Sequence, residues 1–251
     1  TSGQPALVLG TDNETTLSIS FPAGIEAPTD PRDVLVRVSS GAIASLVPLG
    51  GGRFTARYVA PTVNYPHLSM ITVSDRRAPA DIWGVGVIAL QGRVDYPVTA
   101  RPGANVILKV GGREFGPVGA DASGRASVPI VVPPGVGTAV QITADATGVT
   151  EGALDLRVPG ARRLSLFDAP PNVPSDARVS VPVRVVVRKA DGAPDPDAMP
   201  TLTATAGRIS EARHAGNGVF VATYTPPDGR SAITATIQAT LGDTTQSDSI
   251  D

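Results

Sequence analysis

The stretch Gly52-Arg-Phe-Thr-Ala-Arg-Tyr-Val-Ala-Pro61 occurs a second time in the chain, as Gly218-Val-Phe-Val-Ala-Thr-Tyr-Thr-Pro-Pro227. Both copies follow the frame Gly-x-Phe-x-Ala-x-Tyr-x-x-Pro, with Phe54 and Phe220 separated by 166 residues. The chain has only five Phe and four Tyr among 251 residues, so chance is a poor explanation for this match. The repetition indicates that the outer parts of the chain are two copies of one unit.

The register of the repeat extends beyond the quoted phrase. The same offset pairs Gly41 with Gly207 and Ile71 with Ile237, without a gap between them. We therefore predict three domains, at residues 1–90, 91–159 and 160–251, the third repeating the first. Domains of this size bury roughly 60% of their unfolded surface, which is enough for an independent core.

Alternating side chains predict that the repeated units are built of strands. Phe54, Ala56 and Tyr58 fall at every second position, so they share one sheet face, and we expect that face to be core. An aromatic platform for sugar stacking is the alternative. In the third domain Val179 to Val187 and Ile233 to Leu241 also alternate, which predicts one buried and one solvent-facing side. Pro182 places its strand at a sheet edge or a bulge.

The middle part of the chain shows the same period with different turns. Val106, Leu108 and Val110 alternate up to Gly111-Gly112, a tight-turn signal. Asp121-Ala-Ser-Gly124 supplies a second turn ahead of another alternating stretch. No stretch shows helical periodicity over ten residues. The sequence therefore predicts an all-β fold of three tandem immunoglobulin-like β-sandwiches.

The outer segments resemble bacterial immunoglobulin-like domains of the invasin and intimin type, through the Gly-x-Phe-x-Ala-x-Tyr phrase, the following proline and the strand Ile233 to Leu241. The middle segment resembles carboxypeptidase-regulatory or transthyretin-like sandwiches, through residues 102–110 and 121–125. The resemblance implies a surface, outer-membrane-associated or periplasmic array, hence an extracytoplasmic location. The membrane barrel and disulfide-bearing tip of some invasins have no counterpart in this sequence.

Composition argues against several classes of function. With 21 basic and 23 acidic residues and no basic block, the chain lacks the charge pattern of a nucleic-acid-binding protein. Its longest apolar stretch, Ile82 to Leu90, is too short to span a bilayer, so we expect no direct membrane insertion. Cysteine is absent, which excludes disulfides and thiolate metal sites. Because Thr1 is not an initiator residue, we expect a processed or excised piece. Because Asp251 corresponds to Val85 of the first copy, we expect the last strand of the third domain to be incomplete.

Catalytic chemistry finds little support. The only histidines, His67 and His214, are expected at a rim and in a loop, and no nucleophile, zinc-protease or phosphate-loop motif is present. We therefore expect no enzyme activity and no cofactor. Calcium is the one ligand for which the sequence offers candidates. Asp191, Asp195 and Asp197 lie in one interstrand loop, and carboxylates of this kind bind calcium. Asp12-Asn-Glu14 is a second oxygen-rich cluster. The alternative reading of both clusters is turn-forming, solubilising acids.

Trp83, the only tryptophan, lies near the first domain junction. Its side chain either fills space in the core or between two domains, or is exposed and anchors a partner.

These features favour a structural or adhesive role. We expect short, Pro- and Gly-bearing junctions at residues 90–93 and 158–162 to give a semi-rigid rod that positions or contacts a protein or surface glycan. The rival function is a carbohydrate- or protein-binding accessory module of a secreted enzyme. That rival requires an exposed aromatic row, for which the candidates are Tyr65, Trp83, Tyr96 and Phe115.

Overall fold

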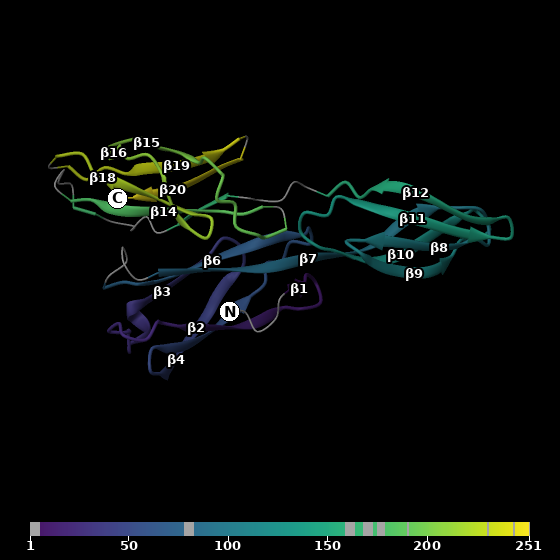
Figure 1. The fold of residues 1–251 in the computed structure, drawn as a ribbon, viewed down its shortest axis with the longest axis horizontal. Coiled ribbons are helices and arrows are strands. Elements are labelled where there is room, and N and C mark those ends of the chain that lie inside the picture. The colour runs from purple at the N-terminus through teal and green to yellow at the C-terminus, as the bar shows by residue number, and fades with distance from the viewer. Residues whose placement is uncertain are drawn as a thin grey trace.

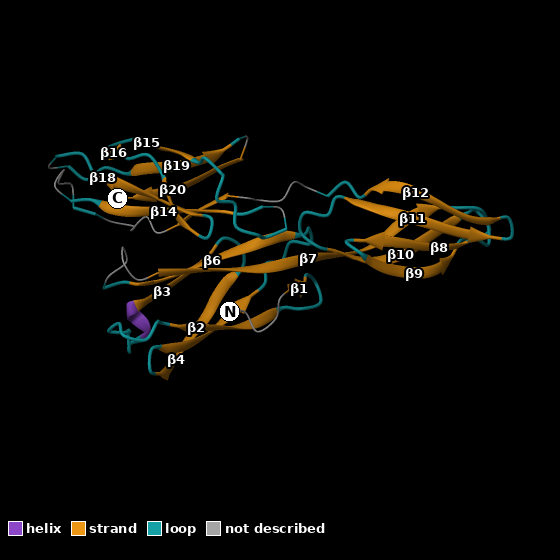
Figure 2. Cartoon of the chain, viewed as in Figure 1, coloured by secondary structure: helices purple, strands orange, loops and turns teal. Residues whose placement is uncertain are grey.

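Strands dominate the computed structural model of the chain, which describes residues 6–77, 83–158, 164–167, 173–174, 179–189, 191–229, 231–242 and 244–250. The one helix in these residues is a single 3-10 turn, η1 (Pro31–Asp33). The predicted all-β class is confirmed (Figure 2). No helix of the described residues is both long and apolar enough to cross a membrane.

The first module is a sandwich of two sheets. One sheet has the order β2-β5-β4, and the other has the order β1-β7-β6-β3. This is the division of strands seen in immunoglobulin-type sandwiches, in which the second, fifth and fourth strands face the seventh, sixth and third. The strands are β1 (Ala6–Val8), β2 (Glu14–Ser20), β3 (Val34–Val38), β4 (Ala42–Gly50), β5 (Arg53–Val59), β6 (His67–Asp75) and the first part of β7 (Trp83–Thr99).

The third module repeats this plan except for its first strand: β1 pairs with β7, whereas β13 pairs with β14 in the opposite sheet. Its sheets are β13-β14-β18, with β16 and β17 both paired to β18, and β15-β19-β20. The two copies of the quoted phrase occupy the equivalent central strands β5 and β18. The strands are β13 (Leu164–Phe167), β14 (Val181–Val187), β15 (Thr201–Ala204), β16 (Arg208–Ile209), β17 (Arg213–Gly216), β18 (Val219–Thr225), β19 (Ala235–Leu241) and β20 (Thr244–Ile250).

The repeated aromatic residues form the module cores, as predicted. Phe54 is 1% exposed and Phe220 4%, and Tyr58 and Tyr224 are equally well buried. The hydroxyl of Tyr58 donates to the carbonyl of Ser40 at 2.9 Å, so its polar end is satisfied inside the sandwich. The core assignment of the ring pair is therefore confirmed, and the sugar-stacking alternative is wrong.

The middle module packs a two-stranded layer against a four-stranded one. The second part of β7 pairs with β10, and the larger sheet has the order β12-β11-β8-β9. Gly111 and Gly112 both have positive φ angles and form the predicted turn between β8 and β9. The strands are β8 (Asn105–Val110), β9 (Arg113–Gly119), β10 (Arg125–Val132), β11 (Thr138–Asp145) and β12 (Gly148–Asp155).

The first junction is a continuous strand. β7 pairs with β6 as far as Leu90 and with β10 from Gly92 onward, so one strand belongs to both modules. We expected a short Gly-bearing junction at residues 90–93; in the structure β7 runs through these residues without a break, with Gly92 inside the strand. A side chain there would collide with the Asn64 carbonyl oxygen at 2.8 Å and the Pro66 ring at 2.9 Å, so glycine allows this loop to close against β7.

The third module lies against the first, while the middle module extends away from both (Figure 1). The three modules therefore do not follow one another in the expected semi-rigid rod. The expectation of a solvent-facing side on β14 is wrong for the same reason, because both Val185 and Val186 are fully buried. Val185 faces the core of its own sandwich, and Val186 faces the first module.

Candidate functional site

The contact between the first and third modules is an apolar cluster of four buried residues. Met70 of β6 belongs to the first module, and Phe167, Val186 and Val219 belong to β13, β14 and β18 of the third. Val85 and Val221 pack around this cluster from the two sides. The contact therefore joins the outer face of the β6–β7 sheet to the outer face of the β14–β18 sheet, which we call the docked faces.

Strand β6 is buried on both sides as a result. Ile71 and Val73 contribute to the core of the first module, while Met70, one position away, belongs to the docked faces. A loop of the third module also reaches this sheet: a side chain at Gly192 would touch Leu68 at 3.4 Å. All residues of β6 except the half-buried Val73 are buried, as is typical of a strand enclosed between two layers.

The docked face of the third module also contains buried charge. Arg184 lies on the outer side of β14 with Val186, and Arg188, one residue past the end of the strand, continues this alternation; they are 1% and 3% exposed. Burial lowers the pKa of the Arg188 guanidinium, because a charged group loses hydration when it leaves water. The contact is thus a mixed surface in which apolar packing is accompanied by a desolvation cost.

The edges of the middle module are not equivalent. β9 carries Pro117 and a register shift at its pairing with β8, and β10 carries Pro129. Proline and irregular pairing both hinder the addition of a further strand. β12 has neither, pairs among the described strands only with β11, and is exposed along nearly its whole length; Val149 is 66% exposed. β12 is therefore the most open edge of this module.

The candidate aromatic row does not assemble. Tyr65 is exposed on a loop of the first module and lies 4.9 Å from the ring of His67. Tyr96 and Phe115 are half-buried against the core of the middle module. Trp83 begins β7 opposite Ser74, but its side chain lies outside the described residues. The three described rings thus serve two different modules and form no shared platform.

The acidic loop between β14 and β15 is organised by its own backbone. The Asp191 carboxylate accepts from the Ala193 N–H at 2.9 Å, as in an Asx turn, while Asp195 is buried and Asp197 exposed. Across the described part of the chain, no three His, Asp or Glu side chains are grouped so that they could hold a metal ion. In the second cluster, Asp12 likewise accepts from the Val8 N–H at 2.8 Å.

His67 was expected at a rim, but it is buried within β6. Its Nε2 lies 2.7 Å from the Ser40 hydroxyl and its Nδ1 lies 2.9 Å from the Tyr65 carbonyl. The Ser40 carbonyl also accepts from Ser69 at 2.7 Å. The ring therefore ties the β3–β4 turn to β6, as a structural link. His214, in contrast, is exposed on β17 beside the Phe220 ring.

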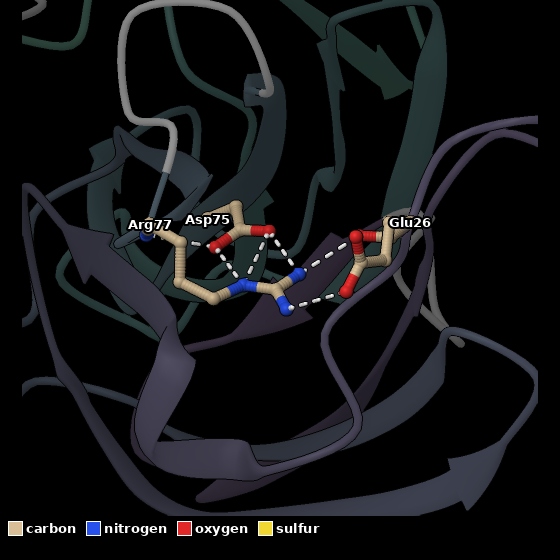
Figure 3. Close-up of polar contacts among 3 residues, drawn as sticks. All are labelled: Glu26, Asp75 and Arg77. Atoms are coloured by element: carbon tan, nitrogen blue, oxygen red, sulfur yellow. Dashed lines mark hydrogen bonds and ion pairs between the residues drawn. The ribbon is translucent and has the colours of Figure 1, made fainter.

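A buried carboxylate fixes the end of β6. Asp75 accepts hydrogen bonds from the guanidinium of Arg77, at 3.1 Å to Nε and 2.8 Å to Nη2. Arg77 also donates to the Glu26 carbonyl at 2.8 Å and approaches the Glu26 carboxylate at 3.8 Å (Figure 3). The hydrogen bonds from Arg77 hold the pKa of Asp75 below its ordinary value. The cluster joins the loop around Glu26 to the β6 sheet.

Sequence reasoning missed the docked faces, although a signal was present. Residues Val183–Val187 include three adjacent valines at positions 185 to 187, and β6 reads His67-Leu-Ser-Met-Ile-Thr-Val-Ser-Asp75 without strict alternation. Such runs indicate a strand covered on both faces. Only the packing of the two modules reveals what covers the second face.

No known protein-family model matches the chain, and no curated protein matches it. Among solved structures, it is similar to InvD and the adhesin InvE of Yersinia pseudotuberculosis, at 12% and 10% identity. Each match covers 99% of this chain, 55% and 56% of those chains respectively, and has a TM-score of 0.28. The chain therefore spans about half the length of these Yersinia proteins.

A similar level of likeness extends to a three-domain fragment of titin, I67–I69. It has 10% identity, covers 96% of this chain and 92% of the fragment, and has a TM-score of 0.36. The chain is a tandem of immunoglobulin-like sandwiches, and that description rests on its own strand order in the first and third modules.

Proposed function

We propose that this chain is a non-catalytic structural and adhesive section of a bacterial extracytoplasmic protein, at the cell surface or in the periplasm. Its three sandwiches act as a bent spacer that holds the middle module out toward a protein partner. The observation that carries the proposal is β7, which runs from the core of the first module into the sheet of the middle one. A shared strand transmits orientation between modules, which a flexible linker does not.

The contact between the outer modules adds to this support. Because Met70, Val186 and Val219 join the first module to the third, the base of the spacer is two sandwiches thick (Figure 1). The middle module is left projecting from that base, and its four-stranded sheet ends in the open edge of β12. We assign partner contact to this edge, where an extended segment of another protein adds as a further strand.

Antibody labelling tests the location. Antibody to the chain should label intact cells of the native bacterium, or cells whose outer membrane alone is permeabilised. Labelling that requires lysis of the inner membrane would contradict an extracytoplasmic role.

Detachment forces test the contact. Beads coated with the full chain are allowed to attach to fixed epithelial cells or to a lawn of the same bacterium, and the force needed to detach them is recorded.

The edge variant is Val149→Lys with Ala153→Lys, since exposed lysines discourage strand addition. It should reduce the detachment force to the level of uncoated beads. The control is Ser45→Lys on β4, an exposed position on a strand that already contains Pro48. Equal forces for the edge variant and the unmodified chain would show that β12 is not the contact, and absence of adhesion by the unmodified chain to both surfaces would reject the adhesive role.

A further inference from the structure

The docked faces differ in sequence from their counterparts in the repeat. Val186 on β14 corresponds to Ser20 on β2, and Val219 on β18 corresponds to Arg53 on β5, at the offset of 166 residues. Ser20 and Arg53 are exposed, whereas Val186 and Val219 are fully buried. The β14–β18 face has therefore acquired apolar residues that the equivalent β2–β5 face lacks.

The first module shows the reciprocal pattern. Met70 on β6 corresponds to Thr236 on β19, which is half-buried on the outer side of its sheet. Leu68, beside Gly192 of the third module, corresponds to Thr234, which is exposed. Apolar residues thus occur on the two faces that meet, and polar residues occur on the two equivalent faces that do not. The two copies of the repeat can therefore be compared with each other, and they differ in the residues that form this contact.

The contact is nevertheless small and partly polar. Among the described residues, its apolar cluster has four buried members, against eight in the main core cluster of the first module. The buried guanidiniums of Arg184 and Arg188 share the docked face, and Thr72 of β6 is also buried. Contacts between domains of one chain move by default unless they are large and hydrophobic. This composition is typical of a contact that opens and closes without unfolding either module.

We propose that the third module is a releasable cover on the first, so that the chain exchanges between a closed form, with the docked faces together, and an extended form. The joint formed by β7 stays rigid during this exchange because it is a paired strand on both sides of Gln91. Opening lengthens the array and uncovers Leu68 and Met70 on the first module. The device combines one fixed joint with one releasable joint.

Pulsed electron paramagnetic resonance on the full chain tests this proposal. The chain contains no cysteine, so labels attach only at introduced positions. Suitable positions are Ser45→Cys on β4 and Gln238→Cys on β19, which are exposed and lie on the sheets away from the contact. The unmodified interface should give a dominant short distance and a minor population at longer distances.

The test variant exchanges residues between the copies, as Val186→Ser with Val219→Arg, and Met70→Thr on the opposite face is an independent second variant. Each should raise the ratio of extended to closed chains by about tenfold or more, corresponding to the 1.4 kcal/mol that one factor of ten represents. Thr55→Ser, on the polar face of the first module, is the matched control and should leave the ratio unchanged. Thermal melts establish that each variant keeps its folded modules.

Two outcomes would overturn the proposal. If the unmodified chain and both variants give one identical short distance, the modules form a single rigid body and the contact does not open. If the unmodified chain gives only long distances, the docked faces do not meet in solution. A shift caused by only one of the variants supports the releasable contact when the other variant fails to fold.

Discussion

Met70 and Val186 are buried in the same apolar cluster, although each lies on the outer face of its own sandwich. Outer faces of isolated sandwiches are normally polar, as the equivalent residues Thr236 and Ser20 illustrate. The pairing of Met70 with Val186 therefore explains the arrangement of the whole array. It brings the third module back along the first and leaves the middle module projecting (Figure 1).

The ring at position 220 should dominate the stability of the third module. Phe220→Ala removes a side chain that is buried with Val185 and Ala239, and we expect a loss of about 3–5 kcal/mol in the free energy of unfolding. Urea unfolding of the full chain measures this loss. Thr203→Ala, at an exposed position on β15, is the control and should change stability by less than about 0.5 kcal/mol. An unchanged transition for Phe220→Ala would contradict its place in the core.

Gly41 and Gly207 occupy the same turn in the two copies, each with φ of +78°. A side chain at Gly41 would lie 2.5 Å from the Val59 carbonyl oxygen, and one at Gly207 would lie 2.5 Å from that of Thr225. Alanine at either position combines this backbone collision with a left-handed conformation that alone costs about 1–2 kcal/mol. We expect each variant to lower the melting temperature of its own module.

The control for these glycines is Gly137→Ala, where a side chain would meet nothing within 4 Å. Scanning calorimetry that resolves the modules measures the effect. If Gly41→Ala changed the melting temperature of the first module as little as Gly137→Ala changed that of the middle module, the turn would relax around the added side chain.

Acid should weaken the first module through Asp75. Because Arg77 lowers the folded-state pKa of Asp75 below its ordinary value of 3.8, the ionised carboxylate stabilises the folded state at neutral pH. This contribution is fully present above about pH 4 and is lost as the pH falls through the lower, folded-state pKa. Asp75→Asn should lower stability at pH 7 by about 1–2 kcal/mol, allowing for the partly exposed Arg77, and should flatten the dependence on pH in the acid range.

Urea midpoints measured at successive pH values from 7 to 3 provide the comparison. Glu26→Gln is the control, because that carboxylate is exposed and 3.8 Å from Arg77, and it should alter stability only slightly. If Asp75→Asn and the unmodified chain lost stability in parallel on acidification, the Asp75–Arg77 pair would not be the source of the acid sensitivity.

The shared strand should determine how the first two modules are aligned. Inserting Gly-Ser-Gly-Ser after Gln91 separates the part of β7 paired with β6 from the part paired with β10. Both modules should remain folded but tumble more independently, because a Gly/Ser segment behaves as a flexible coil. NMR relaxation then gives shorter rotational correlation times for the middle module. Unchanged correlation times would mean that other contacts hold this joint.

Alternation in the sequence was sufficient to predict much of each sandwich. Phe54, Ala56 and Tyr58 are buried together because a period of two places them on one side of β5, whatever lies beyond that sheet. The same rule failed at two places. Ile233 precedes β19 and is exposed, and Val186 is buried on the side predicted to face solvent.

The candidate sites could be predicted less well from the sequence than the strands could. Asp191, Asp195 and Asp197 are close in sequence, but a ligand set depends on side-chain directions that local spacing does not determine. His67 was placed at a rim because its counterpart Ile233 begins a strand, yet Ser40 and Tyr65 enclose it through hydrogen bonds made after folding. Tyr65 is near His67 in sequence, but Ser40 lies on another part of the chain and becomes a neighbour of His67 only in the folded module.

The sequence by itself determined the strands, their inward faces and the equivalence of the outer modules, because each follows from local period, turn residues and the register of the repeat. Only the tertiary structure decided that β7 continues through Gly92 and that Met70 meets Val186. The contact between the modules depends on which outer faces of the folded sandwiches are apolar and can pack together. The residues on these faces are far apart in the chain, so no local sequence pattern specifies which face packs against which.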